Sequence, residues 1–263
     1  MAPKAFPRTP VRFAVIVALC LSALAQQSAQ PPPQVQPKPL TGSERLAQWR
    51  KSRVAIYMDD FGELTRYRSA NATLKPPAPG ENRVVFYGDS ITDGWKLDQS
   101  FPGKPYVNRG IGGQTTAQML VRMFPDVIDL KPSAWILLAG TNDIAHNNGP
   151  QTFAQITENI QAMTELAQLH GIKVILCAVL PVSDYTRAKQ TMRRPPADIL
   201  RLNTWLKNYA AMVKAVYCDY YTATVDEKGF LKDGFSGDGL HPNAQGYALM
   251  APVAEAAIAK ALQ

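Results

Sequence analysis

Residues 83–90 of the chain read RVVFYGDS, an apolar run that ends abruptly in a polar, glycine-containing turn. A short run of β-branched and aromatic residues is typical of a strand that is buried on both faces of a sheet. Gly88 and the two polar residues after it predict a tight turn from this strand into a helix, with Ser90 at the turn. The stretch therefore predicts the first strand of an α/β sheet.

Four further apolar segments predict strands, and helical patterns lie between them. The predicted strands are 106–108, 134–139, 173–180 and 216–221. The predicted helices are 115–124, 153–170, 196–214 and 243–262. Strands that alternate with helices form a parallel sheet that is covered by helices on both faces. The sequence thus predicts an α/β fold with five parallel strands.

The composition is that of one globular domain with a modest positive charge. The chain has 263 residues, of which 46% are hydrophobic, enough to bury a single core. Its formal charge of +7 includes Lys4, Arg8 and Arg12, which leaves 7 − 3 = +4 for the rest. No stripe of basic residues with interleaved aromatics occurs, so we expect no nucleic acid partner. No group of Cys, His and carboxylate residues has metal-ligand spacing, so we expect no metal site.

The first 25 residues have the pattern of a signal peptide. Three basic residues precede the apolar run 13–24, and Ala23-Leu24-Ala25 forms a small-residue cleavage site. The apolar run is about a dozen residues long, whereas a bilayer span takes roughly 20. We therefore expect cleavage after Ala25, a secreted or periplasmic protein, and no stable membrane span in the mature chain.

Three segments follow the predicted leader. Residues 26–41 are rich in Pro and Gln and predict an extended linker. Residues 42–75 are charged and amphipathic, and they predict an N-terminal helical extension that serves as a lid or brace. Residues 76–263 then form the main domain. The sequence carries no signal for an oligomeric state.

Polar, glycine-containing clusters follow the first three predicted strands, and a fourth cluster precedes the last helix. They read GDS at 88–90, NRGIGG at 108–113, GTND at 140–143 and DGLH at 238–241. Reactive groups of such sheets gather beyond the carboxyl ends of the strands. We therefore expect all four clusters to converge on one edge of the sheet.

Each cluster supplies a group that acyl transfer needs. Ser90 stands where a hydroxyl can be exposed, and His241 lies three residues after a carboxylate, that of Asp238. A neutral imidazole can deprotonate the serine, while the carboxylate fixes the tautomer of the ring. The N–H groups of Ser90 and Gly113 and the amide of Asn142 can hold an oxyanion. The pattern predicts an acyl-serine mechanism.

These four blocks resemble the SGNH hydrolases, also called GDSL-type esterases. The matches are Ser90 in GDSIT, Gly113 in NRGIGGQTT, Asn142 in GTND, and His241 with Asp238 in DGLHPN, and the resemblance covers residues 83–262. It implies a flavodoxin-like three-layer α/β/α sandwich with a parallel five-stranded sheet. It also implies hydrolysis of carboxylic esters without a cofactor. No G-x-S-x-G elbow is present, which disfavours the other common fold of exported esterases.

The resemblance leaves the substrate open. Exported members of this family often remove acetyl groups from polysaccharides, and no extended apolar segment predicts a tunnel for a long acyl chain. We therefore expect a short acyl group, such as acetate, on a small molecule or glycan ester. A lysophospholipase-type acylhydrolase and an O-acyltransferase that uses the same acyl-serine are alternatives, as is a non-catalytic glycan-binding module.

Several other residues allow two interpretations. A basic segment lies in a loop bounded by prolines, and we interpret it as solvated, with contact to an acidic substrate or surface as the alternative. Its members are Arg187, Lys189, Arg193 and Arg194.

Asp89 is expected to be a structural hydrogen-bond partner. His146 is a secondary candidate to line the pocket. Cys177 and Cys218 are expected to be free and buried, with a disulfide as the alternative.

Overall fold

The computed structural model describes residues 41–263, so the predicted signal peptide lies outside the described residues. The predicted linker also lies outside them, apart from its last residue, Thr41. Thr41 caps the first helix, because its hydroxyl accepts from the backbone N–H of Glu44 while the Glu44 carboxylate accepts from the Thr41 N–H. This reciprocal pair is the capping box that fixes where a helix begins.

A five-stranded parallel sheet forms the centre of the fold, as predicted. Its strands are β1 (Val84–Gly88), β2 (Tyr106–Gly110), β3 (Ala134–Leu138), β4 (Lys173–Cys177) and β5 (Val216–Cys218). Their order across the sheet is β2-β1-β3-β4-β5, and every neighbouring pair is parallel. All residues of β1 and β3 are buried, as strands covered on both faces require.

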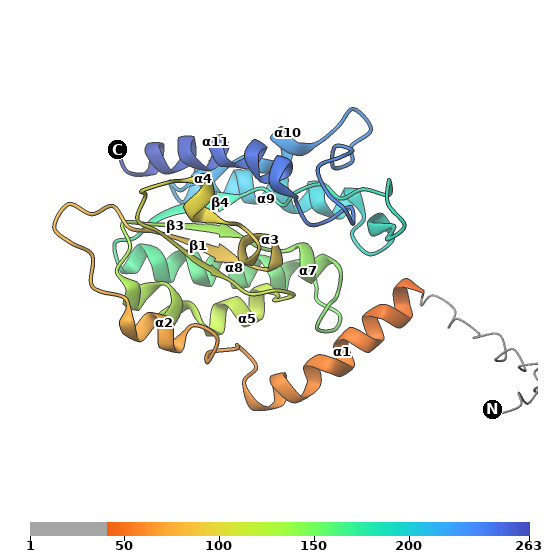
Figure 1. Ribbon diagram of the computed structural model, residues 1–263, viewed down its shortest axis with the longest axis horizontal. Helices are drawn as coiled ribbons and strands as arrows, with labels where there is room; N and C mark the ends of the chain where they lie inside the picture. Colours follow the sequence, from red (N-terminus) through yellow and green to blue (C-terminus); the bar gives the residue numbers. More distant parts are fainter. Residues whose placement is uncertain (1–40) are drawn as a thin grey trace, which may run out of the picture. The chain divides into compact units, whose positions relative to one another are not determined.

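Helices cover both faces of the sheet and give the α/β/α sandwich (Figure 1). In this view α5 (Thr116–Val121) and α8 (Phe153–Leu169) lie on one side, and α4 (Leu97–Ser100) and α11 (Ala244–Ala261) on the other. The remaining α-helices are α1 (Gly42–Asp59), α2 (Arg68–Thr73), α3 (Ser90–Asp93), α6 (Met123–Asp126), α7 (Thr141–Ile144), α9 (Pro196–Met212) and α10 (Tyr220–Thr224). Among the described residues, no helix is both long and apolar enough to cross a membrane.

Three predicted elements are shorter than the sequence suggested. The helix predicted at 115–124 breaks after Val121, because Pro125 has no N–H with which to bond the carbonyl four residues earlier. The strand predicted at 173–180 ends at Cys177, because Asn203 hydrogen-bonds both the N–H and the C=O of Val179. The strand predicted at 216–221 ends at Cys218, because the Asp219 carboxylate caps α10.

Cys177 and Cys218 are register partners on β4 and β5. Both are free and buried, which confirms the prediction made from the apolar segments that contain them. A buried thiol behaves as a small apolar side chain. Burial also raises the pKa of Cys177, which keeps its sulfur protonated and unreactive.

Two arginines of α1 connect the helix to other segments of the chain. Arg50 donates from Nε to the carbonyl of Asn147 over 2.9 Å, and from Nη2 to the carbonyl of His146. Arg53 forms an ion pair with Glu63 at 2.5 Å. The bonds from Arg50 hold α1 against the loop that follows α7, and Arg53 holds it to the segment between α1 and α2.

Candidate active site

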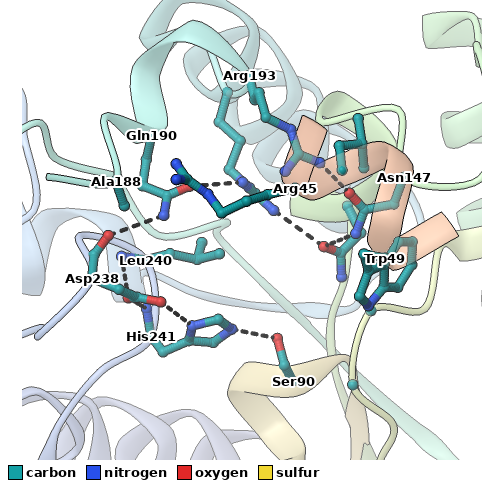
Figure 2. A pocket seen from close by; sticks show the side chains of 15 residues that line it. Arg45, Trp49, Ser90, Asn147, Ala188, Gln190, Arg193, Asp238, Leu240 and His241 are labelled. Atoms are coloured by element: carbon teal, nitrogen blue, oxygen red, sulfur yellow. Dashed lines mark hydrogen bonds and ion pairs between the residues drawn. The ribbon is translucent and has the colours of Figure 1, made fainter. Parts of the chain in front are cut away.

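Ser90, His241 and Asp238 form a continuous chain of hydrogen bonds (Figure 2). The Ser90 hydroxyl lies 2.9 Å from Nε2 of His241. Nδ1 of the same ring lies 2.6 Å from Oδ2 of Asp238. The serine can therefore give its proton to the ring while the carboxylate holds the opposite nitrogen.

Ser90 is presented by the turn between β1 and α3. It is the first residue of α3, directly after Asp89, whose carboxylate accepts from the N–H of Ile91 over 2.9 Å and so caps the helix. Asp89 is fully buried, and desolvation raises its pKa to about 6. The structure thus confirms Asp89 as a structural hydrogen-bond partner at the start of α3.

Asp238 is oriented by the loop that carries His241. Its Oδ1 accepts from the N–H groups of Leu240, at 3.0 Å, and His241, at 2.9 Å. Oδ2 is left facing the imidazole. Partial burial raises the pKa of Asp238, but the hydrogen bonds from His241 and Leu240 outweigh that effect and hold the pKa well below its ordinary value. The carboxylate is therefore ionised and can stabilise a charged imidazole.

The side-chain amide of Asn142 is fixed in one orientation. Its Oδ1 accepts from Asn147 at 2.8 Å and from Arg194 at 3.3 Å, while its Nδ2 donates to the carbonyl of Gln114 at 3.1 Å. An amide nitrogen carries two hydrogens, so one remains for a ligand oxygen. Asn142 lines the same pocket as Ser90, which is where an oxyanion donor is needed.

Gly113 lines the pocket opposite an aromatic ring of α1. Its φ of +81° favours glycine, and a Cβ placed on it would lie 2.5 Å from Cζ2 of Trp49. Trp49 therefore packs directly on the backbone that is predicted to hold the oxyanion. The sequence showed Trp49 as part of an amphipathic stretch but gave no sign of this contact.

One pocket with a volume of about 460 Å³ contains residues from all four sequence clusters. The clusters contribute Ser90, Gly112, Gly113, Asn142, Asp238, Leu240 and His241. The helix α1 contributes Arg45, Leu46 and Trp49 to the lining. The segment 188–194 contributes Ala188, Gln190, Arg193 and Arg194, and the loop after α7 contributes Asn147. The predicted site residues are thus brought together at one edge of the sheet.

The interpretation of the basic segment as a solvated loop is wrong for two of its four members. Arg193 and Arg194 line the pocket, and Arg194 is only 3% exposed. Buried arginine needs partners, and Arg194 has them: it donates to Thr141 and Asn142 as well as to Gln190. Thr141 and Asn142 are distant in sequence, so the local pattern could not reveal these two partners. Arg187 and Lys189 are exposed, as expected.

His146 lines a different pocket from Ser90. That pocket, of about 190 Å³, also includes Phe153 and Arg201. The Nδ1 atom of His146 accepts from the N–H of Gln151 over 3.4 Å. The structure therefore does not place His146 among the residues around Ser90.

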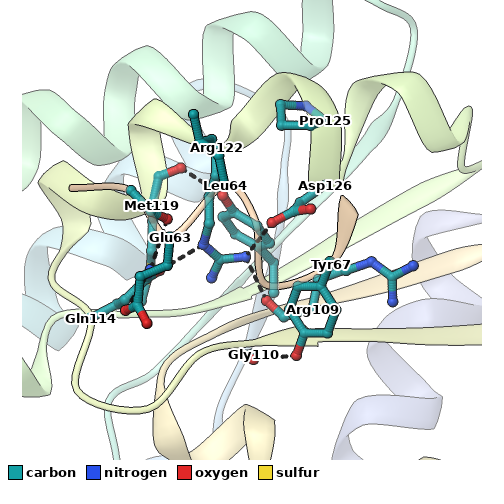
Figure 3. A network of polar contacts seen from close by, with 12 residues as sticks. Glu63, Leu64, Tyr67, Arg109, Gly110, Gln114, Met119, Arg122, Pro125 and Asp126 are labelled. Atoms are coloured by element: carbon teal, nitrogen blue, oxygen red, sulfur yellow. Dashed lines mark hydrogen bonds and ion pairs between the residues drawn. The ribbon is translucent and has the colours of Figure 1, made fainter. Parts of the chain in front are cut away.

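A buried arginine, which sequence reasoning missed, ties the first two clusters together (Figure 3). Arg122 is fully buried and donates to the carbonyls of Gly88 and Arg109, to Oε1 of Gln114 and to the carboxylate of Asp126. Its guanidinium also lies 4.1 Å from the centroid of the Tyr87 ring. One side chain thus fixes the ends of β1 and β2. Of its partners, only Asp126 stands at the four-residue spacing from which a helical ion pair can be predicted.

Comparison with known proteins identifies the family. The model of the GDSL-like Lipase/Acylhydrolase family matches residues 86–249. The chain belongs to this family and is a carboxylic ester hydrolase.

Two solved structures have the same fold over most of this chain. One, from Bacteroides fragilis, is provisionally assigned as an acylhydrolase; it is 40% identical, with a TM-score of 0.73, over 78% of this chain and 99% of that one. The other is a GDSL-like lipase from Bacteroides thetaiotaomicron that is 38% identical, with a TM-score of 0.72, over 77% of this chain and 100% of that one. They support both the fold and the hydrolase class predicted from the sequence.

A curated relative matches a shorter stretch. The uncharacterised lipoprotein YqeF of Bacillus subtilis is 34% identical over 122 residues, which is 39% of this chain. The match spans 50% of the length of YqeF.

Proposed function

We propose that Ser90 is the nucleophile of this esterase, with His241 as general base and Asp238 as the group that orients it. The observation that carries the proposal is the unbroken chain of hydrogen bonds from the serine hydroxyl to the carboxylate, at 2.9 and 2.6 Å. Distances of this size allow proton transfer without rearrangement of the side chains.

The reaction then has two halves. Ser90 attacks the ester carbonyl as His241 takes its proton, and the oxyanion is held by the N–H groups of Ser90 and Gly113 and by the amide of Asn142. Collapse of this intermediate releases the alcohol, which receives the proton from the imidazole. Water, activated by His241, hydrolyses the acyl-serine and restores the free enzyme.

The proposed substrate is a short-chain acyl ester, such as an acetyl ester, on a carbohydrate or other small molecule. Nine of the fifteen residues that line the pocket are polar or charged. Its larger apolar side chains are Leu46, Trp49 and Leu240. A lining of this kind favours a polar alcohol and a small acyl group over a long hydrocarbon chain.

We propose that the enzyme acts outside the cytoplasm, either secreted or in the periplasm. Two observations support this: the signal-peptide pattern of residues 1–25, and the description of the relative YqeF as a lipoprotein. Mass spectrometry of the protein from culture fluid or periplasmic extract should find an N-terminus at Gln26. A chain recovered from the cytoplasm with its leader intact would contradict this.

The proposed mechanism is tested with p-nitrophenyl esters of two to twelve carbons. We expect kcat/KM to fall with chain length, and Ser90→Ala to lower it by at least about 10⁴-fold. Ser69→Ala, which changes an exposed serine on α2, is the matched control. A fluorophosphonate should label the wild-type chain at Ser90. Full activity of Ser90→Ala would exclude the mechanism, and transfer of acetate to an added glycan in preference to water would indicate the acyltransferase.

A further inference from the structure

The pocket around Ser90 carries an excess of positive charge. Among the residues that the structure describes, its lining includes three arginines, Arg45, Arg193 and Arg194, and one carboxylate, that of Asp238. This carboxylate is already engaged by His241 at 2.6 Å. Within the described lining, Asp238 is thus the one carboxylate near Arg193 and Arg194, and it already has a partner.

Two of the three arginines are placed to meet a ligand. Arg194 is used within the protein, because each of its three nitrogens donates to a neighbouring side chain. Arg193 donates from Nη2 to Asn147 at 2.5 Å, but its Nε is buried without an acceptor in the described part of the chain. A guanidinium has five N–H donors, so Arg193 retains several for a bound group.

Arg45 approaches the same space from the opposite wall. Figure 2 shows its side chain extending from α1 across the pocket in the direction of Gln190. The residue is exposed, so its position can adjust to a ligand. Arg45 and Arg193 come from segments about 150 residues apart in sequence, yet they line one cavity with the nucleophile.

The positive charges of Arg50, Arg193 and Arg194 repel one another. Burial lowers the pKa of Arg193, and the charge of Arg50 lowers it further. Burial likewise lowers the pKa of Arg194, to about 10, and the charge of Arg193 adds to the effect. A negative charge bound among these groups would relieve this repulsion.

We propose that the natural substrate carries an anionic group, a carboxylate or a phosphate, which Arg45 and Arg193 bind while the ester lies at Ser90. The inference rests on the proposed function, and because the acyl group proposed there is short, the charge belongs to the alcohol part. Hydrogen bonds from guanidinium to carboxylate or phosphate are among the strongest in proteins, and their fork geometry is selective.

The test compares two matched pairs of acetyl esters by the acetate that they release. The first pair is O-acetylgalactose and O-acetylgalacturonic acid, and the second is monoacetylglycerol and its 3-phosphate. We expect the charged member of one pair to have a kcat/KM at least about tenfold higher, the effect of one hydrogen bond to a charged group. The pair that shows the preference identifies carboxylate or phosphate. Equal kcat/KM for the charged and neutral members of both pairs would contradict the proposed anionic subsite.

Variants show whether the preference comes from these two residues. Arg45→Gln and Arg193→Gln should each lower the ratio of charged to neutral kcat/KM several-fold. Lys51→Gln on α1 and Arg187→Gln in the basic segment remove the same charge from exposed positions outside the lining, and they should keep the ratio. Equal losses in all four variants would indicate a general effect of net charge and would contradict the proposal.

Two further results separate this proposal from the one on which it rests. If Ser90 is labelled and p-nitrophenyl acetate is hydrolysed, but neither pair shows a preference, only the anionic subsite is excluded. If no ester is hydrolysed and Ser90 is not labelled, the proposed function itself fails. Added NaCl should reduce the preference for the charged ester, since it screens the attraction.

Discussion

Arg194 donates from Nη2 to Oδ1 of Asn142 over 3.3 Å, from a side chain that is 3% exposed. A positive charge at the oxygen of an amide draws electron density from its nitrogen and makes the N–H groups better donors. Asn142 is the proposed side-chain donor to the oxyanion. Arg194 is therefore expected to strengthen the oxyanion hole without touching the substrate's reacting atoms.

We predict that Arg194→Met lowers kcat for p-nitrophenyl acetate by about tenfold or more, roughly the effect of weakening one oxyanion donor. KM should change much less, because the interaction matters most when the oxyanion forms. Arg194→Lys should recover part of the loss, since it keeps the charge but not the fork geometry. Steady-state kinetics measures kcat and KM, and urea unfolding checks that each variant is folded. A rise in KM at constant kcat would show that Arg194 acts only in binding.

A second prediction concerns the contact between Gly113 and Trp49. Gly113→Ala should impair both stability and activity, because the new methyl group would meet the indole and the backbone is left-handed. Adding Trp49→Ala to the Gly113→Ala chain removes the clash between the methyl group and the indole. It should therefore recover the stability and activity lost to that clash, but not those lost to backbone strain. The coupling energy from this double-mutant cycle is the quantity to measure.

Gly103→Ala is the matched control for this cycle. Gly103 has a φ of +75°, but nothing lies within 4 Å of a Cβ placed on it. It therefore reports the backbone strain alone, on the order of 1 kcal/mol. If Gly113→Ala costs no more stability than Gly103→Ala, the indole does not restrict this position.

A third prediction concerns Arg122. Arg122→Met removes one partner of a buried ion pair and leaves the Asp126 carboxylate without its charge partner. We expect the free energy of unfolding to fall by about 3–5 kcal/mol. Arg68→Met, at an exposed site on α2, should change it by less than about 0.5 kcal/mol. Urea unfolding followed by circular dichroism measures both.

A further variant separates the charge from the rest of the network. If the unpaired carboxylate causes most of the loss, Arg122→Met combined with Asp126→Leu should be more stable than Arg122→Met alone. If the double variant is no better, the bonds from Arg122 to the carbonyls of Gly88 and Arg109 carry the stability instead.

The fourth prediction concerns the pH dependence of stability. Asp143 is fully buried, accepts from Thr116, and has a pKa that burial raises to about 6. An unfolded Asp titrates near 3.9. Between about pH 4 and 6 the folded chain therefore holds a proton that the unfolded chain lacks, so this residue lowers stability as pH rises through that window.

Asp143→Asn removes this dependence. The quantity to follow is the free energy of unfolding of Asp143→Asn minus that of wild type. From pH 4 to pH 7 this difference should rise by on the order of 2 kcal/mol in favour of the variant. The exposed Asp129→Asn provides the control. Urea unfolding at several pH values gives the difference, and a difference independent of pH would contradict the raised pKa.

The sequence located most of the sheet and of the candidate site. Apolar runs such as 134–139 mark strands buried on both faces, and the polar turns after them must meet at one edge because the strands are parallel. These are properties of short segments and of general topology. For this reason the positions of Ser90, Gly113 and Asn142 around one pocket could be predicted without coordinates, whereas His241 was predicted from its spacing to Asp238 and from the family resemblance.

The parts that could not be predicted depend on contacts between distant segments. Arg122 and Arg194 look like ordinary charged residues in the sequence, yet each is buried because carbonyls and side chains from other loops surround it. The end of β4 is set by Asn203, which bonds the backbone of Val179 from 24 residues further along the chain. Trp49 lines the pocket from α1, a helix that Arg50 bonds to the carbonyls of residues about 100 positions later. No local pattern contains this information.

The wall formed by α1 lies outside the part of the chain that the family model matches, which begins at residue 86. Of the two arginines proposed to choose the substrate, Arg45 therefore lies outside the matched stretch, whereas Arg193 lies inside it with Ser90. Selection can alter Arg45 or Trp49, or exchange the whole helix, while the chemistry at Ser90 stays constant. Exchange of α1 alone would leave Ser90, His241 and Asp238 in place and remove one of the two arginines proposed to bind the anionic group.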